Sequence, residues 1–507
     1  MAGSRARNRD ARPAPPPRAF TAVYLAAIVV AVAVCYARLA GYFFAQDDFI
    51  LLERATFQPG AAVFDFFARE PGHFRPLTKG ACFVVLHRLF GLNAMPYHVV
   101  SLVLHALNAL LIWRALRRLR VGDLAALTGA ALFAMSAAFF HVLAWVSCIQ
   151  QLVGATFMLL ALDQGIAHLD ARRAHARWLS LTAYALALAS LEQTAALPLA
   201  LGAVALLGVG DRERIGWRAA RSALWPHAAL MLAYAGFILL WKTLPGEGDY
   251  DFRAGANVWR NLVTYLGWSL DVHMTMPMEM AVPVPAFRVS HGVLVALLGY
   301  HLARRRWPEV VLGLGFCLAG LAPVLFLENH TFYLHTYVPA LGVIYLLARA
   351  IDDIFSFAGH RHAELPYSLA CLAFVGLAAL CFTDARRNER IQRDDGSGYL
   401  RSFVVRRAIA AQNVRDSLRE QRDPRRNADA VYLVYARPTH EVEQSAWNAL
   451  NVQAALGYGS ELRLIYGNPD LYVRFMYVDE LGATARNPRT DIFFHDDVGH
   501  LRTHIGL

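Results

Sequence analysis

The sequence predicts a mainly α-helical, polytopic membrane protein with a small soluble α/β domain at its C-terminal end. Of the 507 residues, 56% are hydrophobic and only 17% are charged, which is too apolar for a soluble chain of this length. The apolar residues gather in runs of the length that spans a bilayer. From about residue 385 the composition changes, because residues 385–507 carry 18 Arg and 16 Asp or Glu.

The apolar runs predict about eleven transmembrane helices. The first run, 20–39, has no clear small-residue cleavage site and is interpreted as a retained anchor. The run 178–209 is too long for one crossing, so it is divided into two helices around Glu192 and Pro198. The other runs lie at 97–113, 124–140, 142–162, 224–241, 289–303, 309–327, 331–350 and 366–383.

Arginine clusters set the predicted orientation. They precede the first span and follow the second, fourth, sixth and eighth, whereas the turns at His141, Glu192 and Glu328 carry no Lys or Arg. Basic loops stay in the cytoplasm. The N-terminus is therefore predicted to be cytoplasmic and the C-terminus periplasmic or extracellular, with the chain in the inner (plasma) membrane. This topology explains the net charge of +10, and we expect no nucleic-acid partner.

Three regions follow from these patterns. Residues 1–19 are Arg- and Pro-rich and are predicted to be a disordered, basic, cytoplasmic tail. Residues 20–384 form the transmembrane domain, with long outer loops at 40–96 and 243–288. The second loop holds Trp259, Trp268 and a Met-rich stretch, 274–278, that favours an interfacial belt over a contact surface for a sugar or lipid chain.

Residues 385–507 are predicted to form a soluble α/β domain on the outer face. Its expected helices cover 386–421, with a break at 394–398, and 442–456. Its expected strands cover 430–435, 462–466, 471–477 and 491–494.

The predicted topology places eight ionisable side chains on one face of the membrane. Ionisable groups at a membrane edge are costly to bury and are candidates for function. Each alone has a plainer explanation: Glu192 could be a packing carboxylate and His141 a satisfied turn histidine. Together they predict a polar site on the outer surface. The eight residues are Asp47, Asp48, Arg75, Lys79, His141, Glu192, Glu328 and His330.

The first outer loop resembles the GT-C superfamily of integral-membrane glycosyltransferases, which includes protein O-mannosyltransferases and lipid A aminoarabinose transferases. The match consists of the acidic pair Asp47-Asp48 after the first span, FRPLT at 74–78, LFGLN at 89–93 and YHVVSLVLHALNALL at 97–111. Weaker matches are AWVS at 144–147 and YVPALG at 337–342.

The chain also departs from these relatives. They often have an Arg and an Asp just after the Trp-Val-Ser stretch, where this chain has Ile149 and Gln151. Their common Ser-Lys-Glu stretch is Ser190-Leu191-Glu192 here, without the Lys. These departures argue against a second acidic metal-binding motif and leave a diverged or inactive relative open.

The resemblance implies transfer of a sugar from a polyprenyl-phosphate donor to a lipid, glycan or protein acceptor on the outer face of the bilayer. It makes Asp47 the candidate general base, with Asp48 orienting it or binding the acceptor. Arg75 occupies the position of a phosphate-contacting cation, and Lys79 is a second candidate. We expect no resident cofactor, with a divalent metal left open. Candidates for binding the sugar or the acceptor are His141, Glu192, Glu328 and His330.

Two alternatives to a transferase stay open. A transporter or flippase of lipid-linked sugars would be expected to show broken or charged segments near the bilayer midplane and an inverted repeat, and neither is evident. A catalytically inactive scaffold for envelope assembly would keep the fold and use the C-terminal domain as its binding module.

Overall fold

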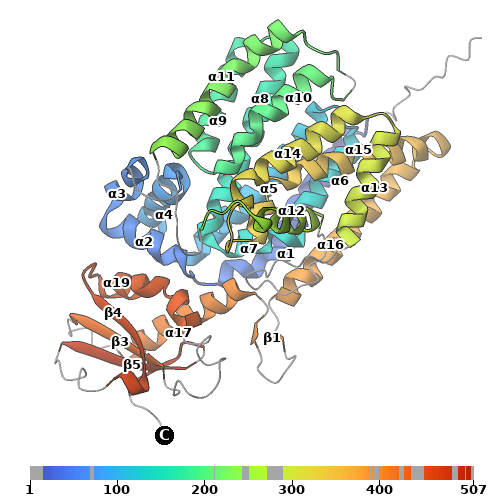
Figure 1. Cartoon of the computed structure of the whole chain (residues 1–507). Helices are drawn as coiled ribbons and strands as arrows, with labels where there is room; N and C mark the ends of the chain where they lie inside the picture. The colour runs from blue at the N-terminus through green and yellow to red at the C-terminus, as the bar shows by residue number, and fades with distance from the viewer. Residues whose placement is uncertain are drawn as a thin grey trace, which may run out of the picture.

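A bundle of long helices and a small sheet at one end of it make up the molecule (Figure 1). The computed structural model describes residues 15–68, 73–210, 212–241, 251–270, 289–388, 391–392, 399–400, 402–421, 428–435, 450–481, 489–496 and 498–503. Most of the predicted disordered tail, residues 1–14, lies outside these ranges, as do the Met-rich stretch 274–278 and residues 442–449 of a predicted helix.

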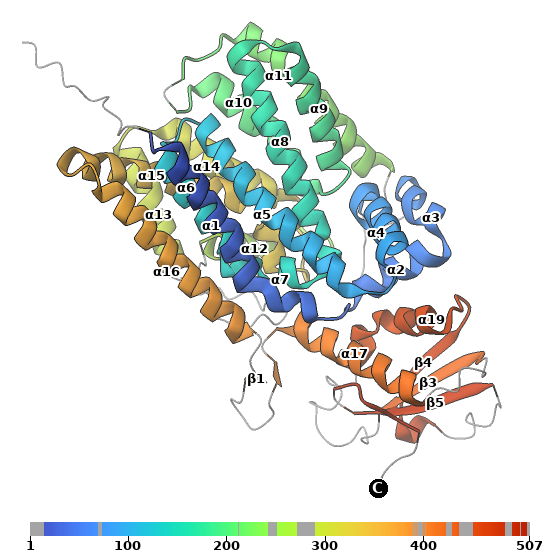
Figure 2. The ribbon, with the colours of Figure 1, turned by 180° about the vertical axis from the view of Figure 1, so that it is seen from behind.

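The bundle helices follow the predicted apolar runs (Figures 1 and 2). In the described part of the chain, six helices are long and apolar enough to cross a membrane, or seven if the bent pair α6 and α7 forms one crossing. The six contain α1 (Arg18–Tyr36), α5 (Ala94–Arg118), α8 (Ile149–Ala171), α11 (Trp217–Gly236), α14 (Trp307–Leu325) and α16 (Leu365–Asn388). The bent pair is α6 (Asp123–Ala134) and α7 (Phe140–Ala144), and the other bundle helices are α9 (Ala174–Leu188), α10 (Leu197–Leu207), α13 (Val289–Ala303) and α15 (Ala340–Arg361).

The helix predicted at 331–350 begins nine residues later than expected. Pro339 precedes α15, which fits a residue that lacks an N–H and favours the start of a helix. Residues 331–339 form a buried segment with one 3-10 turn, η9 (Tyr333–Thr336). Its carbonyl groups are satisfied from neighbouring elements, since Gln193 Nε2 donates to His335 O at 2.8 Å. Non-helical backbone is tolerated at membrane depth where protein buries it in this way.

A closed hydrogen-bond network ties this segment to α5, α6 and α8. His105 Nε2 lies 3.0 Å from Ala134 O and Nδ1 lies 2.9 Å from the Tyr337 hydroxyl. Because a carbonyl only accepts, Nε2 carries the proton and Nδ1 accepts from Tyr337. Asn108 Nδ2 donates to Tyr337 Oη at 3.2 Å, and Thr156 Oγ1 donates to Asn108 Oδ1 at 2.7 Å. A satisfied buried network of this kind fixes how the helices pack.

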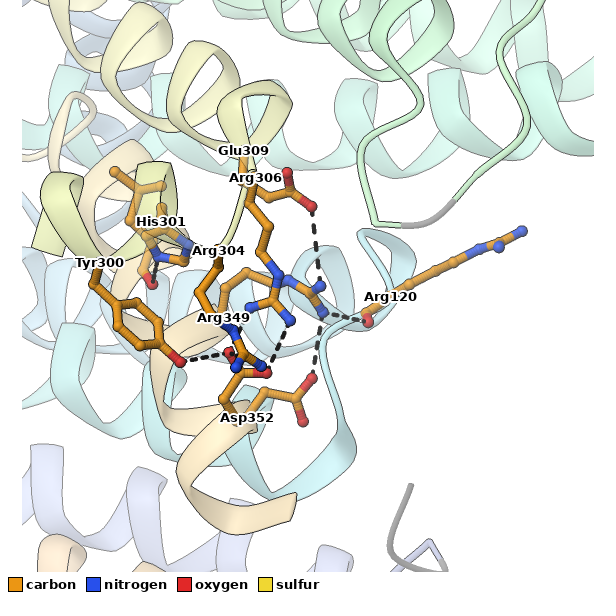
Figure 3. A network of polar contacts seen from close by, with 10 residues as sticks. Arg120, Tyr300, His301, Arg304, Arg306, Glu309, Arg349 and Asp352 are labelled. Atoms are coloured by element: carbon orange, nitrogen blue, oxygen red, sulfur yellow. Dashed lines mark hydrogen bonds and ion pairs between the residues drawn. The ribbon is translucent and has the colours of Figure 1, made fainter. Parts of the chain in front are cut away.

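A second polar network lies beyond the C-terminal end of α5, where α13 meets α14 (Figure 3). Arg349 of α15 is buried, 3.3 Å from an oxygen of Asp352 and 3.9 Å from an oxygen of Glu309. Arg306 donates two hydrogen bonds to Asp353, at 2.5 and 2.9 Å. The network holds this end of the bundle together. Removing one partner of its buried ion pair would leave the other charge uncompensated and would destabilise the packing.

The chain from residue 402 to residue 503, here called the C-terminal unit, contains a four-stranded sheet with the order β4-β3-β5-β6. The central strand β3 (Ala430–Tyr435) is parallel to β4 (Tyr472–Tyr477) and β5 (Thr490–His495), and β6 (Leu501–Arg502) is antiparallel to β5. A short hairpin of β1 (Ile391–Gln392) and β2 (Tyr399–Leu400) leads from α16 to α17 (Phe403–Gln421). The three longer strands match their predicted ranges closely.

The strand predicted at 462–466 is wrong, because these residues belong to helix α19 (Ser460–Tyr466). The physical reason is the topology of the sheet. β3 and β4 are parallel neighbours, so the chain between them must cross back, and such crossovers are usually helical.

The C-terminal unit packs against the first long loop, residues 40–96, with α17 and α19 between the sheet and the bundle (Figure 2). The loop contains α2 (Asp47–Phe57), α3 (Pro59–Phe64), η2 (Asp65–Phe67), η3 (Pro76–Cys82) and α4 (Phe83–Phe90). Phe43, Phe49 and Leu52 of the loop share one apolar core with Val414 and Leu462 of the C-terminal unit. The unit is therefore joined to the loop that carries the acidic pair.

The network around Tyr337 gives a test of the fold. Tyr337→Phe removes the hydroxyl that serves His105 and Asn108, so it should lower the free energy of unfolding by about 1–3 kcal/mol. The matched control is Tyr345→Phe in α15, because the buried Tyr345 hydroxyl has no hydrogen-bond partner among the described residues. Thermal unfolding in detergent should show a loss for Tyr337→Phe alone, and equal unfolding temperatures for the two variants would contradict the assignment.

Candidate active site

Arg75 and Lys79 are placed by the π-helical turn η3, because Arg75 caps it and Lys79 lies within it. Contacts on two sides hold this turn in position. Thr78 Oγ1 donates to Ser190 O at 2.9 Å, which fixes η3 beside the turn between α9 and η6 (Glu192–Ala196). Gly80 permits the close approach to α3, because a Cβ there would lie 2.6 Å from Ala62 O. Short π-helical turns are rare in proteins overall, and those that occur are often found at functional sites. The anchoring brings this turn next to Glu192.

Arg75 and Glu192 form a bidentate ion pair. Arg75 Nε donates to Oε2 of Glu192 at 3.0 Å, and Nη2 donates to Oε1 at 2.5 Å. The Arg75 side chain is only 5% exposed. Burial by itself would raise the pKa of Glu192, but the Arg75 guanidinium beside it holds that pKa well below its usual range. Glu192 is therefore ionised, and both of its carboxylate oxygens accept hydrogen bonds from Arg75.

Lys79 lies on the same turn and has a different environment. Within the described ranges, its ammonium has no carboxylate within 4.0 Å. Burial lowers the pKa of Lys79, the Arg75 charge lowers it further, and the Asp47 charge acts in the opposite direction. Lys79 therefore lies near Asp47 and near the Arg75 ion pair.

Three histidines surround these cations. Burial lowers the pKa of His73 and of His330 to about 3, with the Arg75 charge as the next cause. His73 Nδ1 lies 4.0 Å from Glu192 Oε1, and the His335 ring centroid lies 5.6 Å from that of His330. The imidazoles of His73 and His330 are therefore neutral at physiological pH. Neutral imidazoles offer both donors and acceptors to hydroxyl groups without adding to the positive charge.

The two acids at the start of α2 differ in their surroundings. Asp48 is 2% exposed, and its two oxygens accept the backbone N–H groups of Ala45 at 3.0 Å and Ser147 at 2.6 Å. Burial raises the pKa of Asp48 to about 8, while these two hydrogen bonds lower it. Asp48 thus joins the loop to the turn that follows α7. Asp47 is half-buried and lies near Lys79.

The eight residues singled out in the sequence fall into three groups. Arg75, Lys79, Glu192 and His330 lie in one cluster with Asp47 beside it, and Asp48 faces backbone amides. The remaining two residues have partners elsewhere.

His141 and Glu328 contact other elements. His141 Nε2 lies 3.2 Å from Ser402 Oγ, at the start of α17. Its ring centroid lies 5.0 Å from that of Phe403. Glu328 pairs at 3.0 Å with Arg253, whose side chain is exposed. These contacts give His141 a place under the C-terminal unit and Glu328 a place at the surface.

Sequence reasoning missed two of the three histidines. His73 stands in the same stretch as Arg75 but was not singled out as a site residue. His335 fell inside a run interpreted as a membrane span. The polar residues Thr331 and Thr336 around it are the signal that could have placed this segment outside a helix.

The carboxylates of the site are not arranged as a metal centre. Throughout the described ranges, no group of three or more His, Cys, Asp or Glu side chains could hold a metal ion. The Asp48 oxygens face two amides and the Glu192 oxygens face Arg75.

Comparisons with known proteins found similar solved structures but no matching sequence. No protein-family model matches the sequence, and no curated protein does. The oligosaccharyltransferase AglB of Archaeoglobus fulgidus, solved with an inhibitory peptide and a dolichol-phosphate, has a TM-score of 0.46 and 13% identity over 88% of this chain and 64% of that chain. The same organism's oligosaccharyltransferase tethered with an acceptor peptide gives 0.45 and 13%, over 90% and 63%.

A third similar structure is the mycobacterial arabinofuranosyltransferase AftD, with a TM-score of 0.41 and 15% identity over 83% of this chain and 30% of that chain. AglB is described as an oligosaccharyltransferase and AftD as an arabinofuranosyltransferase. The chain spans less than two thirds of the length of AglB. At TM-scores below 0.5 the likeness is loose, so the function proposed below rests on this chain's own residues.

Asp48 gives a test of the assignment of the two acids. In Asp48→Asn one acceptor oxygen becomes an NH2 group that faces a backbone N–H, and leaving a buried donor unpaired costs about 1–3 kcal/mol. Thermal unfolding in detergent should therefore show a clear loss of stability. Asp47→Asn is the control, because the half-buried Asp47 should lose little. A stable Asp48→Asn beside an unstable Asp47→Asn would reverse the assignment.

Proposed function

We propose that the protein is a glycosyltransferase that moves a sugar from a polyprenyl-phosphate donor to a lipid, glycan or protein acceptor on the outer, periplasmic face of the membrane. The observation that supports this most is Lys79, a half-buried cation without a carboxylate partner among the described residues, near both Arg75 and Asp47. An anion-binding cation next to an accessible acid is the combination that displacement of a lipid phosphate requires.

The pairing of charges in the cluster leaves one cation for an anion. Arg75 and Lys79 supply two positive charges and Glu192 and Asp47 supply two negative charges, but among the described residues only Arg75 and Glu192 form an ion pair there. Glu192 already occupies two N–H groups of Arg75, so Lys79 is the cation that remains for the phosphate. A phosphate oxygen that gains charge during bond breaking is stabilised by such fixed cations.

Asp47 is the proposed general base. It takes the proton of the attacking hydroxyl group, the acceptor oxygen bonds to the anomeric carbon of the sugar, and the bond from that carbon to the phosphate oxygen breaks. The polyprenyl phosphate leaves with the electron pair, held by Lys79 and supported by Arg75. His73, His330 and His335 can hydrogen-bond to sugar hydroxyls in their neutral forms.

The proposed orientation has eleven crossings, a cytoplasmic N-terminus and an external C-terminus. The site lies at the N-terminal end of α5, and the Arg349 network lies at its C-terminal end. α5 has 25 residues, and a helix of that length is about 37 Å long, so the two ends are far apart. Arg114, Arg117 and Arg118 lie at the far end of that helix, as a cytoplasmic end requires. Reporter fusions after residue 120 should read cytoplasmic and fusions near residue 60 external, and a cytoplasmic reading near residue 60 would refute this orientation.

The role of Asp47 has a direct kinetic test. Asp47→Asn keeps the side-chain volume and removes the proton acceptor, and positioned general bases contribute about 10²–10⁴-fold to rate. Turnover of a polyprenyl-phosphate sugar should fall by that factor, while donor affinity should change little. A fully active Asp47→Asn would remove the enzyme proposal for this loop.

Lys79 tests donor binding better than Arg75 does. Arg75→Ala would leave the partly buried Glu192 without its partner and would destabilise the fold. Lys79→Met removes a charge that has no carboxylate partner in the described structure, so the fold should persist. A hydrogen bond to a charged group contributes about 1.5–3 kcal/mol, so donor affinity should fall about 10- to 100-fold.

The matched control for Lys79→Met is Arg54→Met. Arg54 lies in α2 of the same loop and forms an exposed pair with Asp65. Its replacement should leave donor affinity unchanged, as measured by titration of the purified variants with a polyprenyl-phosphate sugar. Equal donor affinities for the wild type, Lys79→Met and Arg54→Met would rule out Lys79 as the phosphate ligand.

A further inference from the structure

Gln46, the residue before Asp47, has a backbone conformation that is unusual for a residue with a side chain. Its φ is +53° and its ψ is −114°, in the positive-φ region that favours glycine. It stands at the N-cap of α2, so the direction of the first helical turn, and with it the place of Asp47, depends on this conformation. Strained residues of this kind persist only where their surroundings hold them, and they gather at functional sites.

The C-terminal unit supplies contacts that hold Gln46. Its N–H donates to Ala455 O at 2.9 Å, and its Oε1 accepts a hydrogen bond from Arg407 Nη1. Arg407 is itself fixed on its own side, because its Nε donates to Asn451 Oδ1 at 3.4 Å and its guanidinium lies 5.1 Å from the Phe403 ring centroid. Arg407 therefore reaches from α17 to the residue that precedes the proposed base.

The charge of Arg407 is not used in an ion pair within the described structure. Its guanidinium has no carboxylate within 4.0 Å there, although burial lowers its pKa only to about 10 and leaves it protonated. Arg463, by contrast, pairs with Glu53 of α2 at 3.3 Å and ties the same two parts of the chain together. The Arg463–Glu53 pair thus already attaches the C-terminal unit to the loop. Arg407 makes a different contact, a hydrogen bond to Gln46.

We propose that the C-terminal unit positions the proposed base through Arg407, which holds Gln46 in its positive-φ conformation and thereby fixes Asp47 near Lys79. The inference rests on the proposed function for the role of Asp47. Arg407 contacts Gln46 and acts through it, so it is a positioning residue. The soluble unit would then control turnover without binding the donor phosphate.

The test uses the full chain in detergent with a polyprenyl-phosphate sugar. Displacement of a catalytic group by about 1 Å can cost 10²-fold in rate, so Arg407→Ala should lower kcat by roughly 10²-fold with donor affinity unchanged. Arg407→Lys should recover part of the rate, because an ammonium can still donate to Gln46 Oε1. Adding Gln46→Ala to Arg407→Ala should cause no further loss, since both variants break the same contact.

The control on the same helix is Arg419→Ala. Arg419 is exposed and lies 4.0 Å from Asp416, away from the loop contacts described above. This variant should turn over at the wild-type rate. A loss of donor affinity in Arg407→Ala that equals its loss of kcat would overturn the inference, because it would show a general loss of structure. An Arg407→Lys variant as slow as Arg407→Ala would also count against it.

Amide hydrogen exchange at residues 45–48 separates this inference from the proposed function. Arg407→Ala should speed exchange there, and Arg419→Ala should not. Faster exchange in a protein that transfers no sugar would keep the positioning role and overturn the function. Wild-type exchange together with wild-type kcat in Arg407→Ala would overturn the positioning role and keep the function. If Arg407→Ala does not fold, Arg407→Lys decides by the same two readouts.

Discussion

A partly buried bidentate ion pair between Arg75 and Glu192 joins the parts of the chain that form the site. Two charges are costly to desolvate, and the pair persists because two N–H groups of the guanidinium donate to the two carboxylate oxygens. Arg75 leads into η3 and Glu192 begins η6, so the pair joins the first long loop to the middle of the bundle. Lys79 lies one turn further along η3, where its charge remains available to a ligand.

The C-terminal unit completes this arrangement from outside the bundle. It shares an apolar core with the first loop and holds Gln46 at the start of α2, while Asp48 is held from the bundle by the N–H of Ser147. The proposed base is thus placed from two sides by parts of the chain that are distant in sequence. The scaffold alternative would need only the attachment, and the direction of Arg407 toward Gln46 is what favours a role in turnover.

Local pattern predicted most of the helices, because membrane-length apolar runs leave few options for the backbone. It could not predict pairs such as Arg75 with Glu192, 117 residues apart, or Gln46 with Arg407, 361 residues apart, because side-chain partners across such distances leave no periodic signal. The late start of α15 was missed because most of residues 331–339 are apolar or aromatic, as they would be in a membrane helix. The α19 error arose because a short apolar run fits a strand and a helix equally well.

The central claim is that a lipid phosphate binds between Lys79 and Arg75 beside Asp47. The most direct measurement is a cryo-electron microscopy structure of the protein in nanodiscs with an added polyprenyl phosphate. The account predicts density for the phosphate within hydrogen-bond distance of Lys79 Nζ, at the loop end of α5. Phosphate density at the opposite end, beside the Arg349 network, with none at Lys79, would contradict it.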